Sequence, residues 1–141
     1  MIEINNLETK LDKDGFIVSD IKGVSMLPLL KQGRDRVIVS KINKPLNKYD
    51  VVLYKVNNKY ILHRIIDINN DDYVIRGDNC INKEIINKTN ILGILIAFYR
   101  KDEYIEVTEE MNKKCYFSSN NSILFRRIKA KIRRMLFNID E

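Results

Sequence analysis

Hydrophobic residues in the first 107 positions occur in short runs that are separated by polar turns. The runs are rich in β-branched and aromatic residues, and they stop at asparagine-containing clusters such as 57–58 and 69–72, which tolerate turn geometry. Short strands with polar turns between them are typical of an antiparallel meander, sandwich or barrel. We therefore predict a mainly β fold, with strands over residues 37–39, 51–56, 60–68, 73–76, 91–100 and 104–107.

The last segment changes from a strand pattern to a helical one. When residues from Ile123 to Ile139 are placed at 100° intervals, the apolar ones fall within an arc of about 120°. Six basic residues and no acidic one lie between Arg126 and Arg134, and the polar residues 118–122 are typical of a helix start. We predict a β domain over residues 1–110 and a basic, amphipathic helical tail over 111–141. The apolar arc consists of Leu124, Phe125, Ile128, Ile132, Met135, Leu136 and Ile139.

Length and composition favour one globular protein in a reducing compartment. The chain has 141 residues, of which 45% are hydrophobic, and this is enough to bury a core. Its two cysteines, Cys80 and Cys115, show neither a zinc-ligand spacing nor a disulfide framework. We therefore expect two free thiols, and neither a metal nor another cofactor.

No segment of the sequence predicts a signal peptide or a membrane span. Residues 1–22 contain charges throughout, and the longest apolar run, 91–98, is far shorter than the roughly 20 residues of a spanning helix. We therefore expect a cytoplasmic protein. The formal charge of +6 is concentrated near the C-terminus, which suggests an anionic partner for the tail rather than a basic protein throughout.

Three side chains in separate segments could form a hydrolytic site. A serine hydroxyl attacks a carbonyl only when a base accepts its proton, so Ser25 and His63, the only histidine, are candidates for nucleophile and base. Asp78 could orient the imidazole. In such a site the Ser25 hydroxyl should lie within hydrogen-bond reach of a His63 nitrogen. Each residue also has a structural explanation, because His63 can be a core residue between Ile61 and Ile65, and Asp78 can cap a turn.

Four short motifs occur in the order of the signal peptidase I boxes. Over about residues 15–107 the chain resembles the S24/S26 serine peptidase superfamily, which implies a signal peptidase/SOS-repressor-like antiparallel β domain. The usual bacterial base is a lysine before an arginine, and here that place holds His63. The chain is therefore similar to the endoplasmic-reticulum, archaeal and sporulation-type branch, which uses Ser, His and Asp. The motifs are Gly23-Val24-Ser25-Met26-Leu27-Pro28, Tyr49-Asp50-Val51-Val52, His63-Arg64-Ile65 and Gly77-Asp78-Asn79.

The resemblance implies a role for each site residue in an endopeptidase that cleaves a protein or peptide precursor. Ser25 is the nucleophile, and its backbone N–H is one donor to the oxyanion. His63 is the general base and later the acid for the leaving amine. Asp78 is the first choice for the carboxylate that orients His63, and Glu84, where that branch also carries an acidic residue, is the second. Cys80 is interpreted as a passive neighbour, since nothing nearby marks it as a low-pKa thiolate.

The chain departs from the family pattern at three points. Tyr49 replaces the glycine expected before Asp50, and the segment 33–35 stretches a Gly-Asp pair that follows the serine box. The third departure is that no N-terminal membrane anchor is visible. In this respect the chain is more similar to the compact, anchorless S24/S26 peptidases of bacteria.

Two other functions fit the same fold. One is a catalytically silent peptide-binding module, although such a module has no need to retain Ser25, His63 and Asp78 together. The other is a self-cleaving regulator similar to the SOS repressors. That function is disfavoured, because the chain contains neither an Ala-Gly nor a Cys-Gly bond and carries a histidine in place of the repressors' lysine.

The amphipathic tail allows two interpretations that the sequence leaves open. The apolar arc of the Ile123–Ile139 helix could dock on the β domain or on another subunit, with its basic residues solvated. The same helix could instead lie on an anionic membrane surface, which would make the protein peripheral on the inner membrane. A nucleic acid is a weaker third candidate, because no aromatic stacking platform or base-reading motif accompanies the basic residues.

Overall fold

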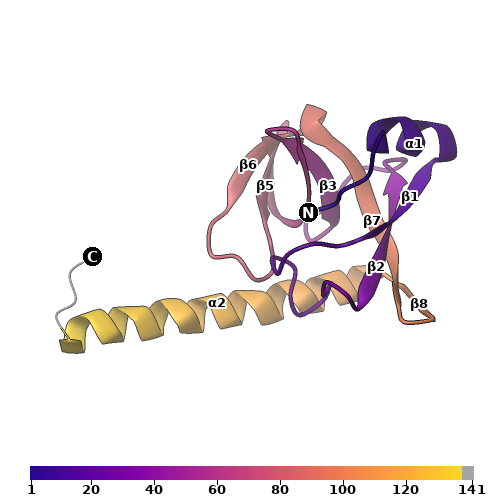
Figure 1. Cartoon of the computed structure of the whole chain (residues 1–141). Coiled ribbons are helices and arrows are strands. Elements are labelled where there is room, and N and C mark those ends of the chain that lie inside the picture. The colour runs from indigo at the N-terminus through magenta and orange to yellow at the C-terminus, as the bar shows by residue number, and fades with distance from the viewer. Residues whose placement is uncertain (138–141) are drawn as a thin grey trace.

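The computed structural model describes residues 1–137 and has a mainly antiparallel β architecture with a C-terminal helix (Figure 1). This confirms the predicted fold class. In chain order the elements are α1 (Leu7–Asp14), β1 (Phe16–Asp20), β2 (Asp35–Lys41), β3 (Val51–Val56), β4 (Lys59–Asn69), β5 (Asp72–Arg76), β6 (Glu84–Asn87), a short 3-10 helix η1 (Lys88–Asn90), β7 (Ile91–Arg100), β8 (Glu103–Glu106) and α2 (Glu109–Phe137).

The strands form one sheet in the order β1-β2-β7-β3-β4-β5-β6, and β8 pairs with β7 outside this path. Every pair is antiparallel, and bulges in the β2–β7, β3–β7 and β4–β5 pairs bend the strands. Two groups of buried side chains form the core. One lies among α1, β1, β2 and the middle of the sheet, and the other lies among β3 to β6, around Tyr54, Ile65 and Ile75. Both sides of β3 are therefore buried, and this strand is central to the site described below.

The six predicted strands are all present, and four elements were not predicted. The β3 and β7 strands have the predicted bounds, and Asn57 and Asn58 both adopt the left-handed backbone expected of the turn between β3 and β4. The missed elements are α1, β1, β6 and the short 3-10 helix η1. Helix α1 is only two turns long, so its single pair of buried leucines, Leu7 and Leu11, carries too short a repeat to stand out from the strands.

The start of α2 corrects the predicted position of the C-terminal helix. The helix begins at Glu109, well before the polar residues 118–122 that were expected to start it. Thr108 caps it, because its side-chain hydroxyl accepts a hydrogen bond from the N–H of Met111 at 3.1 Å, and two glutamates occupy the first turn. Residues 118–122 are helical because tertiary packing outweighs their weak helix propensity. Ile139, the last residue of the predicted arc, lies outside the described residues.

Helix α2 is attached to the sheet by its first half only. The side chains of Asn112, Ser119 and Ile123 are buried, and the Tyr49 ring stacks on Tyr116 with ring centres 4.7 Å apart. Beyond this contact the helix runs past the β domain (Figure 1). No helix among residues 1–137 is both long enough and apolar enough to cross a membrane.

Candidate active site

Ser25 lies in an irregular segment between β1 and β2 that is tied to the turn after β5. Its carbonyl oxygen accepts a hydrogen bond from the N–H of Asn79 at 2.8 Å, and the Asn79 side chain donates to the Val24 carbonyl at 3.1 Å. Gly23 has a φ of 86°, a left-handed conformation that side chains disfavour. The Met26 side chain is buried in the core. The glycine and the methionine that flank Ser25 therefore fix a half-buried serine at the surface of the sheet.

His63 lies on β4 and is held by a tyrosine from the neighbouring strand. The register pairs Val52 with His63 and Tyr54 with Ile61, so Tyr54 and His63 are diagonal neighbours on one face of the sheet. The Tyr54 hydroxyl is hydrogen-bonded to Nδ1 of His63 at 3.0 Å. Tyr54 is fully buried and packs in the core of β3 to β6, so it positions the imidazole rigidly and leaves Nε2 as the nitrogen available to a reacting group.

Gly77 is the point at which the serine segment and the imidazole meet. A Cβ atom at this position would lie 2.7 Å from the carbonyl oxygen of Ser25 and 3.0 Å from Nε2 of His63. The Sγ atom of Cys80 would lie 2.9 Å away. All three atoms therefore border the small space that the missing side chain leaves. In the Gly77-Asp78-Asn79 motif, the glycine permits this close approach because it has no side chain. Its backbone φ is not in the left-handed region.

The direct hydrogen bond predicted between Ser25 and His63 is not formed. Among the described residues, neither the hydroxyl nor the backbone N–H of Ser25 makes a hydrogen bond. Both groups are thus available to a substrate. Catalytic hydrogen bonds are often long or absent before a substrate binds, and they tighten when it arrives.

Among residues 1–137 no hydrogen bond joins Asp78 to His63, which corrects the expected role of Asp78 as the orienting carboxylate. Both of its oxygens accept hydrogen bonds from Arg64, at 2.7 Å from Nε and 2.8 Å from Nη2. Arg64 also donates to the Tyr49 carbonyl and to the Asn112 side chain of α2. Successive residues of a strand point to opposite faces, so Arg64 and its partner Asp78 lie on the α2 side of the sheet, away from the imidazole of His63.

Glu84, the second candidate carboxylate, lies near the tyrosine that holds His63. Burial raises the pKa of the Tyr54 hydroxyl, and the negative charge of Glu84 raises it further. Tyr54 therefore stays protonated at neutral pH and can donate a hydrogen bond while it accepts one. Through this hydroxyl, a carboxylate can act on His63 without touching it.

The imidazole and the neighbouring thiol are both neutral at pH 7. Burial, assisted by the positive charge of the N-terminal amino group, lowers the pKa of His63 to about 4. Burial and then the charge of Glu84 raise the pKa of the Cys80 thiol. His63 is thus free to accept a proton, while Cys80 is a poor nucleophile, as the sequence predicts for a passive neighbour.

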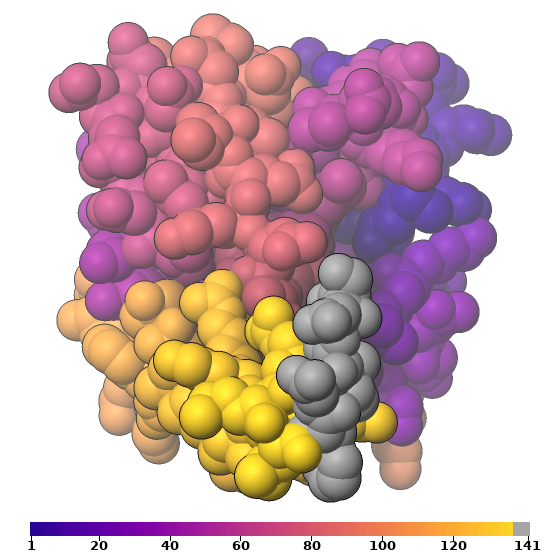
Figure 2. Space-filling model, turned by 90° about the vertical axis from the view of Figure 1, so that its left-hand side faces the viewer, coloured from indigo at the N-terminus to yellow at the C-terminus, as the bar shows by residue number. Residues whose placement is uncertain are grey.

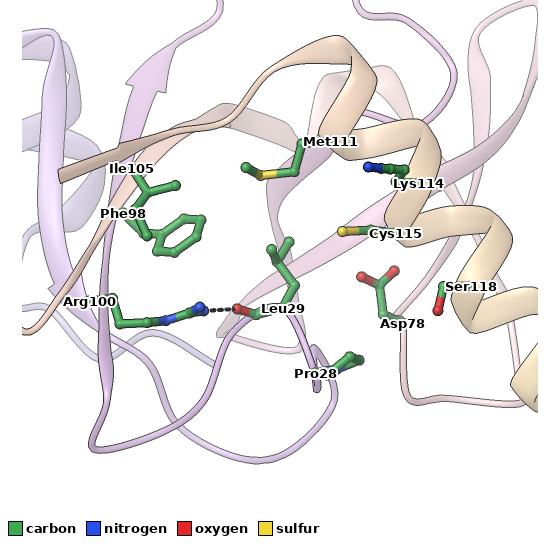
Figure 3. Close-up of a pocket in the computed structure, with 10 residues that line it drawn as sticks. All are labelled: Pro28, Leu29, Asp78, Phe98, Arg100, Ile105, Met111, Lys114, Cys115 and Ser118. Carbon is green, nitrogen blue, oxygen red and sulfur yellow. Dashed lines mark hydrogen bonds between the residues drawn. The ribbon is translucent and has the colours of Figure 1, made fainter. Parts of the chain in front are cut away.

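A pocket of about 440 Å³ lies on the other side of the serine segment, between that segment and α2 (Figure 3). Its lining is mostly apolar, and at one edge Arg100 donates a hydrogen bond to the Leu29 carbonyl. Asp78 borders the pocket, whereas Ser25, His63 and Tyr54 do not. The pocket and the space at Gly77 are therefore separate. The lining residues are Pro28, Leu29, Asp78, Phe98, Arg100, Ile105, Met111, Lys114, Cys115 and Ser118.

Sequence reasoning missed Tyr54 and the partner of Arg64. Tyr54 was assigned only to a strand, and its contact with His63 depends on the register between β3 and β4. The signal for Arg64 was present, because it directly follows His63 and must face the opposite side of the strand. Within the described residues, no group of three or more His, Cys, Asp or Glu side chains is placed to hold a metal ion. No protein-family model matches the chain, and a search of curated proteins finds no match either.

Proposed function

We propose that the chain is a serine endopeptidase of the signal peptidase I-like S24/S26 type, in which Ser25 is the nucleophile and His63 the general base. The observation that carries this proposal is that the backbone carbonyl oxygen of Ser25 and Nε2 of His63, from segments 38 residues apart in the sequence, both border the position of a Cβ at Gly77. It is also supported by the Ser25 hydroxyl and N–H, which make no hydrogen bond within residues 1–137. One group can attack a carbonyl while the other donates to the oxyanion that forms.

The proposed reaction begins when a substrate peptide bond lies against the Ser25 hydroxyl, within reach of His63 Nε2. Ser25 Oγ attacks the carbonyl carbon, and its proton passes to His63 Nε2. The oxyanion accepts a hydrogen bond from the backbone N–H of Ser25. Loss of such a hydrogen bond typically raises the activation barrier by about 3 kcal/mol. The imidazolium then gives the proton to the leaving amine, and a water molecule hydrolyses the acyl-enzyme by the same proton route.

Tyr54 takes the orienting role that the sequence assigns to Asp78. In the reactive arrangement, Nδ1–H of His63 donates to the Tyr54 oxygen, and the Tyr54 hydroxyl donates toward Glu84. This chain of donors leaves Nε2 as an acceptor, which is the tautomer that a general base needs. The 3.0 Å contact at Nδ1 and the influence of Glu84 on Tyr54 support this assignment.

The backbone conformation of Tyr49 supports the resemblance to the S24/S26 peptidases at a position where the sequence departs from the family pattern. Tyr49 stands where the family has glycine, and it adopts a φ of 82°, which is a conformation that favours glycine. The Tyr49 ring packs against Tyr116 and Phe117 of α2. The two free cysteines support a reducing compartment, and we place the enzyme in the cytoplasm on that basis.

Incubation with a peptide library, followed by mass spectrometry of new termini, tests the peptidase proposal. We expect cleavage by the full chain, and loss of cleavage in Ser25→Ala and His63→Ala variants that remain folded. Cys80→Ser is the matched control, because Cys80 borders the same space and should be dispensable. Equal cleavage by the wild type and Ser25→Ala, or loss of cleavage in Cys80→Ser alone, would contradict the proposal.

A silent peptide-binding module is the second candidate, and two observations favour it. Among the described residues no hydrogen bond joins Ser25 to His63, and the Asp78 carboxylate is fully engaged by Arg64. In a module of this kind, library peptides bind to the wild type and to Ser25→Ala with equal affinity, and no new termini appear. The cleavage assay therefore separates the two functions.

A further inference from the structure

The C-terminal half of α2 is a helical arm whose only hydrogen bond to the β domain, among the described residues, runs from Arg127 to the Ile81 carbonyl at 3.4 Å. We use "arm" for residues 124–136. Ile123 is the last buried side chain, and every residue of the arm is exposed. Six large apolar side chains of the arm, Leu124, Phe125, Ile128, Ile132, Met135 and Leu136, are between 49% and 75% exposed. At 1.5 Å per residue the arm extends about 20 Å beyond the last buried residue.

The apolar arc of the arm points away from the β domain. The face of α2 that packs on the sheet is marked by the buried side chains of Asn112, Ser119 and Ile123. Ser119 and Ile128 are nine residues apart, which at 3.6 residues per turn places them on opposite faces of the helix. In this arrangement the arc therefore does not dock on its own domain. Figure 2, which views the molecule from the side of the C-terminal end of α2, shows the arm at the lower edge of the molecule.

The positive charge of the arm indicates which kind of surface binds its apolar arc. From Met111 to Phe137 the helix carries no acidic residue, and the arm has six basic ones. Lys129 lies next to one edge of the arc, and Lys131 and Arg127 lie next to the other, when residues are placed at 100° intervals. An apolar stripe with basic residues along both edges is the arrangement of a helix that lies in the headgroup region of an anionic bilayer.

We propose that the arm binds the surface of an anionic membrane, with the apolar arc in the lipid and the β domain on the side away from it. A second copy of the chain fits the arm poorly, because two arms would bring like charges together and neither has an acidic residue to pair with them. A nucleic acid would neutralise the basic residues but would leave the six apolar side chains exposed to water. Of these three partners, only the lipid surface satisfies both features of the arm.

Vesicle binding by the full chain tests this proposal. Co-sedimentation with vesicles of phosphatidylcholine plus phosphatidylserine is compared with vesicles of phosphatidylcholine alone. We expect binding to the anionic vesicles only, and weakening by salt. In the double variant Ile128→Gln/Ile132→Gln, which removes apolar area from the arc, binding should fall at least about tenfold. Removal of charge by Lys129→Gln should weaken binding about fivefold.

The opposite face of the arm offers a matched control. Ala130 lies away from the arc, so Ala130→Gln should leave vesicle binding unchanged. Because the chain contains no tryptophan, Phe125→Trp and Ala130→Trp give single fluorescent probes on the two faces. We expect a blue shift on vesicle addition for the probe at 125 and little shift at 130.

Three results would overturn the proposal. The first is the absence of binding by the full chain to anionic vesicles. The second is a dimer in solution that the Ile128→Gln/Ile132→Gln variant dissociates, which would assign the arc to a second copy. The third is binding of an oligonucleotide that competes with the vesicles and is insensitive to the arc variant. None of these results depends on peptidase activity, so they are distinguishable from a failure of the proposed function.

Discussion

At the scale of single residues, the candidate site depends on a glycine, a tyrosine and a histidine that lie in three different elements. Gly77 gives the serine segment room to approach the imidazole, and Tyr54 fixes the imidazole from the other side. The two contacts act on different nitrogens of His63. They can therefore be tested independently.

A methyl group at Gly77 should separate the serine from its base. In Gly77→Ala the new carbon would lie 2.7 Å from a backbone oxygen, so the Ser25 segment must move. We expect peptidase activity to fall by about tenfold to a hundredfold, because small displacements of reacting groups are costly. Gly15→Ala is the control, since Gly15 has a φ of 81° but no neighbour within 4 Å of the added carbon. It should lose stability without losing activity per folded molecule; equal activity losses in both variants would contradict a role for Gly77 in the site.

The low pKa of His63 predicts two effects of acid. Peptidase activity should fall as the imidazole becomes protonated, and the stability of the fold should fall as well. NMR of the single imidazole should show titration near pH 4 in the folded protein instead of the usual 6.5. Between pH 6.5 and 4 the unfolded chain binds a proton on His63 that the folded chain does not. Stability from this group is therefore complete above pH 6.5 and falls by up to about 3 kcal/mol as the pH is lowered to 4. A midpoint near 6.5 in the folded protein would show that the imidazole is not buried as described.

Removal of the Tyr54 hydroxyl should change the tautomer of His63. In Tyr54→Phe we expect kcat/KM to fall by about tenfold to a hundredfold, and the ¹⁵N shifts of the ring to move toward the Nε2–H form. Glu84→Gln should lower kcat/KM and move the ¹⁵N shifts in the same direction as Tyr54→Phe does, but to a smaller extent, because Glu84 acts through Tyr54. If the ring stays in the Nδ1–H form in Tyr54→Phe, Tyr54 is a packing residue and not a positioning residue.

At the scale of elements, α2 consists of a half that is docked on the sheet and a half, the arm, whose side chains are exposed. The docked half carries the buried side chains and the aromatic contact with Tyr49, whereas the arm has only exposed side chains. Thr108 starts this helix on the sheet and thereby fixes where the arm leaves it. The Arg127 side chain is the only link from the arm to the sheet domain among the described hydrogen bonds, to the Ile81 carbonyl at 3.4 Å.

Truncation should separate the two halves of α2. A chain that ends after Ile123 should lose less than about 1 kcal/mol of unfolding free energy, because the side chains that it loses from the described residues, 124–136, are all exposed. A chain that ends after Cys115 also loses Ser119 and Ile123, and it should be destabilised by several kcal/mol. Urea unfolding of both chains gives the comparison. A large loss in the longer chain would mean that the arm packs on the domain in solution.

At the scale of the whole molecule, the Arg64–Asp78 pair joins regions that are distant in the sequence. Arg64 on β4 bonds to Asp78 after β5, to the Tyr49 carbonyl before β3 and to Asn112 on α2. Both charged side chains are almost completely buried. Such a pair is costly to break, because removal of one partner leaves an uncompensated charge inside the protein.

Asp78→Asn should therefore be a stability variant and not a change in the chemistry of His63. We expect a loss of about 3 to 5 kcal/mol in unfolding free energy, with an unchanged pKa of His63 in the molecules that remain folded. Glu84→Gln, at an exposed position, should cost less than about 0.5 kcal/mol. Thermal unfolding and NMR titration measure the two effects. A shift of the His63 pKa in Asp78→Asn would restore Asp78 to the orienting role.

The sequence alone determined the features that depend on local pattern. Alternating hydrophobic runs and asparagine turns specify the strands of β2 to β5, β7 and β8, because strand periodicity and turn geometry are properties of adjacent residues. The exposed arc of the arm is likewise encoded by helical periodicity. The motifs around Ser25, His63 and Gly77 also stand out in the sequence, although no contact between them can be derived from it.

Only the tertiary structure decided which of these groups meet. Tyr54 reaches His63 because strand register places it diagonally opposite, and Asp78 is committed to Arg64 because both face α2. The helix starts at Glu109 because packing and the Thr108 cap outweigh the weak propensity of residues 118–122. The direction of the apolar arc, away from the domain, follows from which face of α2 is buried. Each of these outcomes depends on contacts between distant segments, and local pattern contains no information about them.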